Sequence, residues 1–295
     1  MSRAIAIASC DLFAEKGYEE DLLLVAALRD RGLDPVIRSW SDPAVDWSAF
    51  DLTVIRSTWD YTQRRQEFLD WAAGVPRLLN PVEVIRPNSD KRYLAGLAEA
   101  GLPIVPTTFF GPDEPVQLPS HGEFVIKPSV GAGAKGAGRF DGDVEADLID
   151  AAVHAKHLQA EGRTVMVQPY LTDVDSVGET ALIFIDGKFS HAICKSALLP
   201  PDARHSLTEP GLASETLFIE ETITPRTPSA DELALAERVV AQVAAEPLLY
   251  ARVDLLPAGD GPVVIEVELT EPSLFLGFDP AAAGRLADAI QARLG

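Results

Sequence analysis

The feature that most constrains the fold is the alternation of short apolar runs with helical patterns in the first third of the chain. The run AIAIAS is followed by a helical pattern from Tyr18 to Arg29 that ends at Gly32. The strand-like runs DPVIRSW and DLTVIRS then precede a second helical pattern over residues 64–73. Because strands that alternate with helices form parallel sheets covered by helices, we expect an α/β domain over residues 1–87.

Such a sheet binds its ligands at the carboxyl ends of its strands. The candidate substrate-binding residues at those ends are Cys10, Asp11, Arg56, Trp59, Asp60 and Tyr61. An arginine placed there can pair with a carboxylate. A structural interpretation is equally open, in which Asp60 caps the next helix and the two aromatic side chains pack on it. For Cys10, the sequence favours a buried structural thiol over a nucleophile.

The pattern changes near Asn80, where a second, more mixed region begins. Asn88 is expected to cap a helix over residues 90–100, and EFVIKP and GRF indicate strands of a smaller sheet, followed by a helix over residues 143–159. Further strand patterns are TVMVQPY, ETALIFID, KFSHAICK, YARVDLL and PVVIEVEL. A proline-rich loop is expected over residues 196–215. The sequence therefore predicts a parallel-sheet domain followed by α+β subdomains.

Composition excludes several classes of partner. The formal net charge of −20 argues against nucleic acid and against an anionic membrane surface, because both require a basic face. No apolar stretch approaches the roughly 20 residues that cross a bilayer. The two cysteines cannot form a disulfide framework, which fits a reducing cytoplasm. The sequence leaves open whether copies of the chain associate as a homo-oligomer.

A glycine-rich segment, SVGAGAKGAG, follows the strand EFVIKP. Gly131, Gly133 and Gly136 form a literal G-x-G-x-x-G, the pattern of a dinucleotide-binding turn. That turn must open a helix, whereas here a short strand and a turn, GRFDGD, come next. We therefore expect a flap that folds its amides over a triphosphate. Lys127 lies at the end of an otherwise apolar strand, and burying its charge costs free energy unless the ammonium meets an anion. The alternative is a surface lysine whose ammonium reaches solvent.

Two consecutive strands near the carboxyl end carry charges among apolar residues. Arg252 and Asp254 lie two apart, as do Glu266 and Glu268, so each pair shares one face of its strand. If the strands pair antiparallel, three carboxylates converge beside one guanidinium. Hard oxygen ligands of this kind suit Mg²⁺, while the alternative is a solvated outer face. Two Mg²⁺ ions together with Lys91, Lys127 and Arg252 would balance ATP and the three carboxylates.

These motifs occur in an order that resembles the ATP-grasp superfamily over nearly the whole chain. The set runs Asp90-Lys91, Lys127, the glycine flap, Gln168-Pro169-Tyr170-Leu171, Gly178-Glu179, Lys195, Arg252-x-Asp254 and Glu266-x-Glu268. No single motif is specific, but the ordered set is. The resemblance implies an N-terminal substrate-binding domain, a small lid subdomain over residues 88–167, and a C-terminal subdomain over residues 168–295 that carries the metal site.

The resemblance also implies roles for individual residues at the nucleotide. Lys91 and Lys127 would contact the α- and β-phosphates beneath the glycines of the flap. The segment from Gln168 to Leu171 would be the hinge whose backbone meets the adenine edge. Glu179 would bind the ribose hydroxyls.

At the reacting centre, the resemblance implies that Lys195 and Arg204 approach the γ-phosphate or the acyl phosphate. Asp254, Glu266 and Glu268 would bind Mg²⁺, with Arg252 beside the reacting atoms. Many members of the superfamily have Asn where this chain has Glu268, which puts that ligand in doubt.

The finer pattern VIRSTWDY, HAICK and EVELTEPSLFL is similar to the compact cyclo-ligases that form cycloserine from O-ureidoserine, and it adds Ser273 to the candidate substrate residues. The resemblance thus implies an ATP-dependent ligase that activates a small carboxylic acid as an acyl phosphate for attack by an amine. The amine belongs either to the same molecule or to a second substrate. A nucleotide-binding module without catalysis is a third reading, which the intact set of charged residues disfavours.

Overall fold

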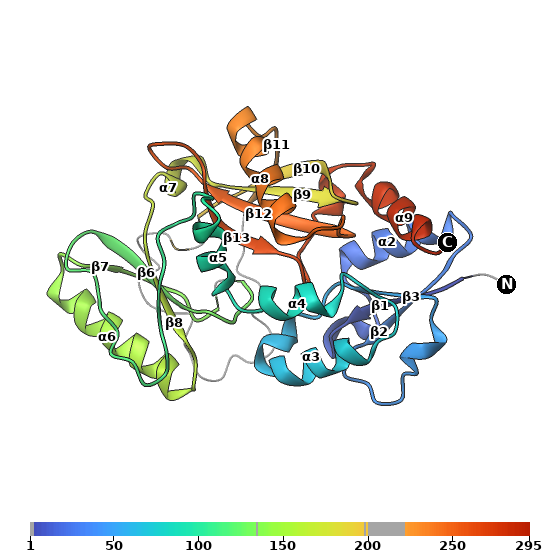
Figure 1. Cartoon of the computed structure of the whole chain (residues 1–295), viewed down its shortest axis with the longest axis horizontal. Coiled ribbons are helices and arrows are strands. Elements are labelled where there is room, and N and C mark those ends of the chain that lie inside the picture. Colours follow the sequence, from blue (N-terminus) through green and yellow to red (C-terminus); the bar gives the residue numbers. More distant parts are fainter. Residues whose placement is uncertain (1–2, 134, 198, 200–221) are drawn as a thin grey trace.

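The computed structural model describes residues 3–133, 135–197, 199 and 222–295. Arg204, and nearly all of the loop expected over residues 196–215, lie outside these ranges. Three sheets organise the molecule (Figure 1): a small sheet at the left of the view, a C-terminal sheet at the top and an N-terminal sheet at the lower right. No described helix is long and apolar enough to cross a membrane.

The N-terminal sheet is parallel, as the alternating pattern predicted. Its order is β2-β1-β3-β4, formed by β1 (Ala4–Ser9), β2 (Asp34–Ser39), β3 (Leu52–Ile55) and β4 (Leu78–Leu79). The helices between these strands are α1 (Asp11–Ala14), α2 (Glu19–Arg29) and α3 (Arg65–Gly74), with the 3₁₀ turns η1 (Trp47–Ala49) and η2 (Trp59–Gln63). β1 is apolar from Ala4 to Ala8, as expected of a strand in a parallel sheet that is covered on both faces.

The small sheet is antiparallel and has the order β5-β8-β6-β7. It comprises β5 (Thr108–Phe110), β6 (Glu123–Pro128), β7 (Gly138–Asp141) and β8 (Val165–Pro169), and α6 (Glu145–Ala160) packs on it. The boundary expected between residues 167 and 168 falls inside β8. β7 follows the glycine-rich segment directly, so the helix that a dinucleotide fingerprint requires is absent from this described part of the chain.

The C-terminal sheet is antiparallel, with the order β11-β10-β9-β12-β13. Its strands are β9 (Glu179–Ile185), β10 (Lys188–Lys195), β11 (Ile223–Arg226), β12 (Tyr250–Leu256) and β13 (Val263–Glu268). Around it lie α7 (Val174–Val177), α8 (Ala230–Val243), the 3₁₀ turn η4 (Leu276–Phe278) and α9 (Ala282–Ala292). α9 contacts α2, which joins this sheet to the N-terminal domain (Figure 1).

The prediction that Asn88 caps a helix over residues 90–100 was wrong. Two short helices occupy this region, α4 (Val82–Asn88) and α5 (Tyr93–Glu99), and Asn88 is the last residue of the first. Its side-chain amide donates to the carbonyl of Val267 at 2.7 Å and accepts from the amide of Leu269 at 2.8 Å. Asn88 therefore satisfies backbone groups at the end of β13, a tertiary role that local sequence pattern cannot reveal.

Candidate active site

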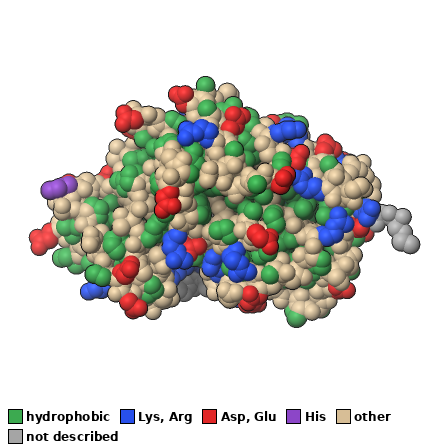
Figure 2. All heavy atoms as spheres, in the orientation of Figure 1, with side chains coloured by type: hydrophobic (Ala, Val, Ile, Leu, Met, Phe, Trp, Pro, Cys, Tyr) green, Lys and Arg blue, Asp and Glu red, His purple; other side chains and the backbone are tan. Residues whose placement is uncertain are grey.

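A cavity of about 750 Å³ is lined by residues from the small sheet, the C-terminal sheet and the segments that follow strands of the N-terminal sheet. Its lining includes the end of β6, the glycine-rich segment, η2, and the paired strands β12 and β13. This size fits a nucleotide together with a small acid. On the face shown in Figure 2, acidic side chains are scattered, and lysine and arginine side chains occur in several places, among them the lower centre. The general negative charge of the chain is therefore interrupted by basic side chains on this face.

The charged residues of β12 and β13 face one another as the spacing predicted. The two strands are antiparallel, with Arg252 opposite Glu268 and Asp254 opposite Glu266. On the other face, the apolar side chains of Val253 and Val267 are buried in the core. A strand pair that is apolar on one face and charged on the other therefore forms one wall of the cavity.

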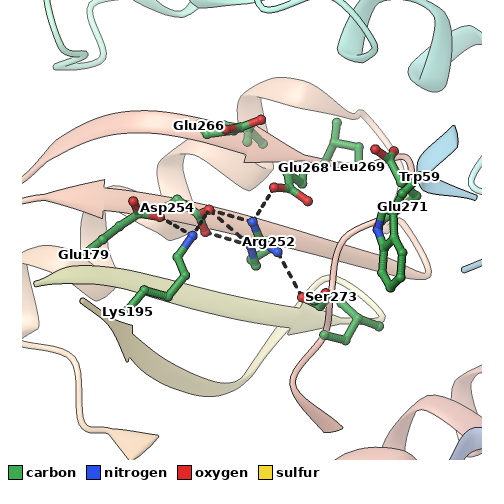
Figure 3. A network of polar contacts seen from close by, with 12 residues as sticks. Trp59, Glu179, Lys195, Arg252, Asp254, Glu266, Glu268, Leu269, Glu271 and Ser273 are labelled. Atoms are coloured by element: carbon green, nitrogen blue, oxygen red, sulfur yellow. Dashed lines mark hydrogen bonds and ion pairs between the residues drawn. The ribbon is translucent and has the colours of Figure 1, made fainter. Parts of the chain in front are cut away.

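Arg252 joins several acceptors at the centre of this wall (Figure 3). Its Nε donates to Oδ1 of Asp254 at 2.9 Å, and its Nη2 donates to Oδ2 of the same carboxylate at 2.8 Å. Nη2 also donates to Glu268, and Nη1 donates to the backbone carbonyl of Ser273 at 3.1 Å. Although burial acts against it, the charge of Asp254 and then that of Glu268 hold the pKa of Arg252 well above its usual value. The guanidinium is therefore fixed and charged.

Lys195, at the end of β10, forms the second cluster of this wall. Its ammonium pairs with Glu179 and lies 2.9 Å from Oδ2 of Asp254. Burial raises the pKa of Glu179 to about 7, with the Asp254 charge adding to the effect and Lys195 opposing it. Against burial, Arg252 and then Lys195 hold the pKa of Asp254 far below its usual value. Asp254 is thus ionised and engaged by two cations.

Lys91 connects the C-terminal sheet to the glycine-rich segment. Its ammonium lies 2.9 Å from Oε1 of Glu266 and donates to the carbonyl of Gly131 at 2.8 Å. Its backbone amide donates to the carbonyl of Ser129 at 2.7 Å. Against burial, Lys91 and then Lys127 lower the pKa of Glu266. One lysine therefore links a carboxylate of the metal candidate set to the base of the expected flap.

Lys127 differs from the buried cations that line the cavity beside it, Lys91, Lys195 and Arg252. It lies at the end of β6 with no ion pair among the described residues. Burial lowers the pKa of its ammonium to about 8, and the attraction of Glu266 only partly offsets this effect. A lysine held in this way fits an anionic ligand, as its position in an apolar strand suggested.

The expected hinge, from Gln168 to Leu171, lines the cavity. The Gln168 amide donates to Oγ1 of Thr107 at 2.8 Å, and the ring of Tyr170 lies 3.5 Å from the Arg139 guanidinium. Apolar side chains line the cavity near this segment, namely those of Val125, Leu171, Leu256 and Ile265. Several of them belong to one apolar cluster with Val105 and Val174. Sequence analysis predicted Leu171 as part of the hinge but missed Val125, Leu256 and Ile265, because an apolar residue in a strand carries no mark of what it will face.

The candidate substrate residues separate into two groups. Trp59, Tyr61 and Ser273 line the cavity. The other four do not belong to its described lining: Cys10, Asp11, Arg56 and Asp60. All four follow the carboxyl ends of parallel strands, as expected. The N-terminal sheet reaches the cavity through η2, however, and not through these four side chains.

Other partners explain where these four side chains lie. Arg56 is 2% exposed and pairs with Glu20 and Asp21 of α2. Asp60 accepts from Nε1 of Trp40 at 2.8 Å and pairs with Arg64. Asp11 accepts hydrogen bonds from Ser39 and Ser41. Cys10 is buried, which raises its thiol pKa, as expected of a structural cysteine.

The carboxylates of the metal candidate set do not form a preformed cluster. Within the described ranges, no group of three His, Cys, Asp or Glu side chains is arranged to hold a metal ion. Each of the three carboxylates instead meets a cation: Asp254 meets Lys195 and Arg252, Glu266 meets Lys91, and Glu268 meets Arg252. Glu266 and Glu268 line the cavity, and burial raises the pKa of Glu268 to about 7.

Comparison with solved structures places this architecture in a known class. The chain is similar to the crystal structure of an ATP-grasp RimK domain protein from Sphaerobacter thermophilus, with a TM-score of 0.65, 19% identity, and coverage of 98% of this chain and 99% of that one. It is also similar to the crystal structure of D-cycloserine synthetase DcsG, with a TM-score of 0.84, 33% identity, and coverage of 99% and 100%. The fold is that of the ATP-grasp ligases.

The relatives in sequence narrow this class. Residues 5–80 match the family model described as the N-terminal domain of D-cycloserine synthetase DcsG. Over 289 residues, 92% of each chain, the sequence is 37% identical to the cycloserine biosynthesis protein DcsG of Streptomyces lavendulae. The chain belongs to the DcsG family.

Proposed function

We propose that this chain is an ATP-dependent cyclo-ligase that forms cycloserine by closing a ring within one amino-acid-like substrate, O-ureidoserine. The observation that carries the proposal is the 37% identity to a cycloserine biosynthesis protein across 92% of both chains. The cavity supports it, because one volume is lined by the candidate nucleotide residues, Arg252 and the side chains of η2. An ATP-consuming reaction of this kind belongs in the cytoplasm.

The residues around the cavity fit ATP. Lys127 is a buried cation without an ion pair in the described part of the chain, and Lys91 lies beside the glycine-rich segment. We assign these two lysines to the phosphates, with Gly131, Gly133 and Gly136 in the flap above them. The adenine would lie against the apolar side chains near Gln168–Leu171, and Glu179 would meet the ribose. These roles assume that the chain divides into a lid subdomain, residues 88–167, and a C-terminal subdomain, residues 168–295.

The acidic residues fit Mg²⁺ if their present cationic partners release them. Glu266 and Glu268 face the cavity, whereas both oxygens of Asp254 are held by cations. We propose that Lys91 and Lys195 turn toward phosphate oxygens when ATP enters, and that Arg252 turns toward the acyl phosphate as it forms. These exchanges would free the three carboxylates, which would then hold two Mg²⁺ ions. Bound Mg²⁺ supplies charge neutralisation at the phosphate oxygens.

The reaction then has three steps. In the first, an oxygen of the substrate carboxylate attacks the γ-phosphorus, the new O–P bond forms, and the bond to ADP breaks. In the second, the side-chain nitrogen bonded to oxygen attacks the acyl carbon, a C–N bond forms, phosphate leaves, and the nitrogen loses its proton. In the third, water cleaves the carbamoyl group from this nitrogen, which takes up a proton, and the group leaves as carbon dioxide and ammonia to give cycloserine. The Arg252 guanidinium and the Lys195 ammonium stabilise the negative charge that develops at the acyl phosphate. We assign the same role to Arg204, which lies outside the described residues.

The proposal is tested by incubating the enzyme with Mg-ATP and O-ureidoserine while following phosphate release and product mass. We expect phosphate release without an added amine and a product with the mass of cycloserine. Release that requires a second amine would establish an intermolecular ligase instead. Tight ATP binding without phosphate release, across a panel of amino acids and their O-substituted derivatives, would indicate a non-catalytic nucleotide-binding module.

A further inference from the structure

Glu271 is a buried carboxyl group in the cavity to which sequence analysis assigned no role. It lies three residues beyond the end of β13, lines the cavity, and is 8% exposed. Figure 3 shows its side chain beside Trp59, away from the cluster around Asp254. The indole Nε1 of Trp59 donates to the backbone carbonyl of Glu271 at 3.1 Å, which holds this segment against η2.

Glu271 differs from the neighbouring acids in what it faces. Glu266 and Glu268 each meet a lysine or an arginine, whereas Glu271 has no cationic partner among the described residues. Its polar neighbour is the hydroxyl of Tyr61. Burial, followed by the charge of Glu268, raises the pKa of Glu271 to about 8. A buried carboxyl group of this kind gains most from a cation that arrives with the ligand.

The side chains around Glu271 suit a small organic cation. Tyr18, Trp59 and Tyr61 line the same end of the cavity, and the rings of Tyr18 and Trp59 meet edge to face at 4.8 Å between centroids. Aromatic rings attract an ammonium group through their negative faces. Hard cations such as Mg²⁺ prefer a site with several oxygen ligands, which an aromatic wall does not offer.

We propose that Glu271, with Trp59 and Tyr18 beside it, binds the α-ammonium group of the substrate. This inference rests on the proposed function and deepens it, because ring closure between the carboxyl carbon and a side-chain nitrogen leaves the α-amino group unreacted. A short segment links this subsite to the reacting centre, since the carbonyl of Ser273, two residues on, accepts from Arg252. Holding the ammonium at Glu271 therefore sets the distance between the carboxylate and the guanidinium.

The test pairs a protein change with a substrate change. The substrates are O-ureidoserine and its analogue in which hydrogen replaces the α-ammonium group. We expect the wild-type enzyme to favour the ammonium-bearing acid by roughly a hundredfold in kcat/KM. Glu271→Gln preserves the volume and the hydrogen bond to Tyr61, and we expect it to reduce this preference to less than about tenfold while the KM for ATP stays unchanged.

Glu83→Gln, an exposed change on α4, serves as the matched control and should keep the full preference. Glu271→Asp keeps the charge and should retain part of it. The proposal would be overturned if Glu271→Gln still discriminated between the two acids like the wild type, or if it lost kcat equally for both acids. The wild-type comparison stands even if a variant fails to fold, because a wild type that accepts both acids equally has no ammonium subsite.

Failure of this inference can be told apart from failure of the proposed function. If O-ureidoserine is inert but another amino acid supports phosphate release, the cycloserine assignment falls. The same pair of measurements then uses that amino acid and its des-amino analogue. Loss of the preference in Glu271→Gln would still support the subsite, and its persistence would refute it.

Discussion

The two walls of the nucleotide cavity hold their cations in opposite ways. Along the C-terminal sheet, Lys195 and Arg252 are each paired with carboxylates. On the small sheet, Lys127 has no such partner within the described residues. The paired cations stabilise the ligand-free fold and must change partners during the reaction, Lys195 when ATP binds and Arg252 when the acyl phosphate forms. The unpaired cation destabilises the ligand-free fold and is satisfied when phosphate arrives.

The largest expected effect comes from removing the central guanidinium. Arg252→Ala should lower kcat by roughly 10²–10³-fold while the KM for ATP changes little, because its charge acts at the acyl phosphate. Steady-state kinetics of phosphate release measure both quantities. Arg238→Ala, an exposed change on α8, is the matched control and should leave both unchanged. Equal losses in turnover and in ATP affinity would show that Arg252 belongs to the nucleotide site instead.

A second prediction compares the paired and unpaired lysines by stability. Lys195→Met leaves Glu179 without its cation and should lower the free energy of unfolding by roughly 3 kcal/mol. Lys127→Met removes a buried charge that has no ion pair, so it should not lower the stability of the free protein, although it should weaken ATP binding.

Chemical denaturation without nucleotide gives the two stabilities, with exposed Lys156→Met on α6 as control. If both variants lose the same stability, the contrast between the two walls is wrong.

The third prediction concerns pH and sharpens the same contrast. The pKa of Lys127 is about 8 in the folded chain against an ordinary value of 10.5. Between these values the unfolded chain binds more protons than the folded chain, so this residue makes stability rise with pH across the interval and adds no slope below it. The difference in unfolding free energy between wild type and Lys127→Met should therefore shift in favour of the wild type from about pH 7 to about pH 10. A difference that is independent of pH would mean that Lys127 is not buried as described.

The smallest expected effect lies in the glycine-rich segment that connects to the small sheet. Gly136 has φ +77°, a conformation that disfavours any residue with a Cβ, and an added Cβ would lie 3.3 Å from Pro128. Gly136→Ala should cost about 1–2 kcal/mol in unfolding free energy. Gly131→Ala is the matched control, since Gly131 has no positive φ and an added Cβ would make ordinary contacts. Equal stability of the two variants would show that the segment relaxes freely.

Periodicity predicted the parts of the fold that rest on local pattern. The alternation in the first third gave the parallel sheet, and the two-residue spacing of Arg252 with Asp254 gave the charged wall. Lys127 was recognisable because one charge ends an apolar strand. In each case the chemical signal lies within a few residues of chain.

Tertiary contacts explain what the sequence could not show. Asn88 was expected to begin a helix, but it is the last residue of α4, and its amide binds the carbonyl of Val267, 179 residues further on. Arg56 follows a parallel strand like a ligand-binding residue, yet acids on α2 surround it. Glu271 follows β13 in a segment without periodicity, and its importance becomes visible through Tyr61 and Trp59, which come from a different domain.

The central claim is that the enzyme activates a carboxylate by phosphorylating it. The most direct test supplies O-ureidoserine with ¹⁸O in both carboxyl oxygens and measures the isotope content of the released phosphate by mass spectrometry. The account predicts one ¹⁸O in each phosphate, because the bridging oxygen of the acyl phosphate leaves with phosphorus when nitrogen attacks carbon. Phosphate without ¹⁸O, or label found in AMP, would contradict it.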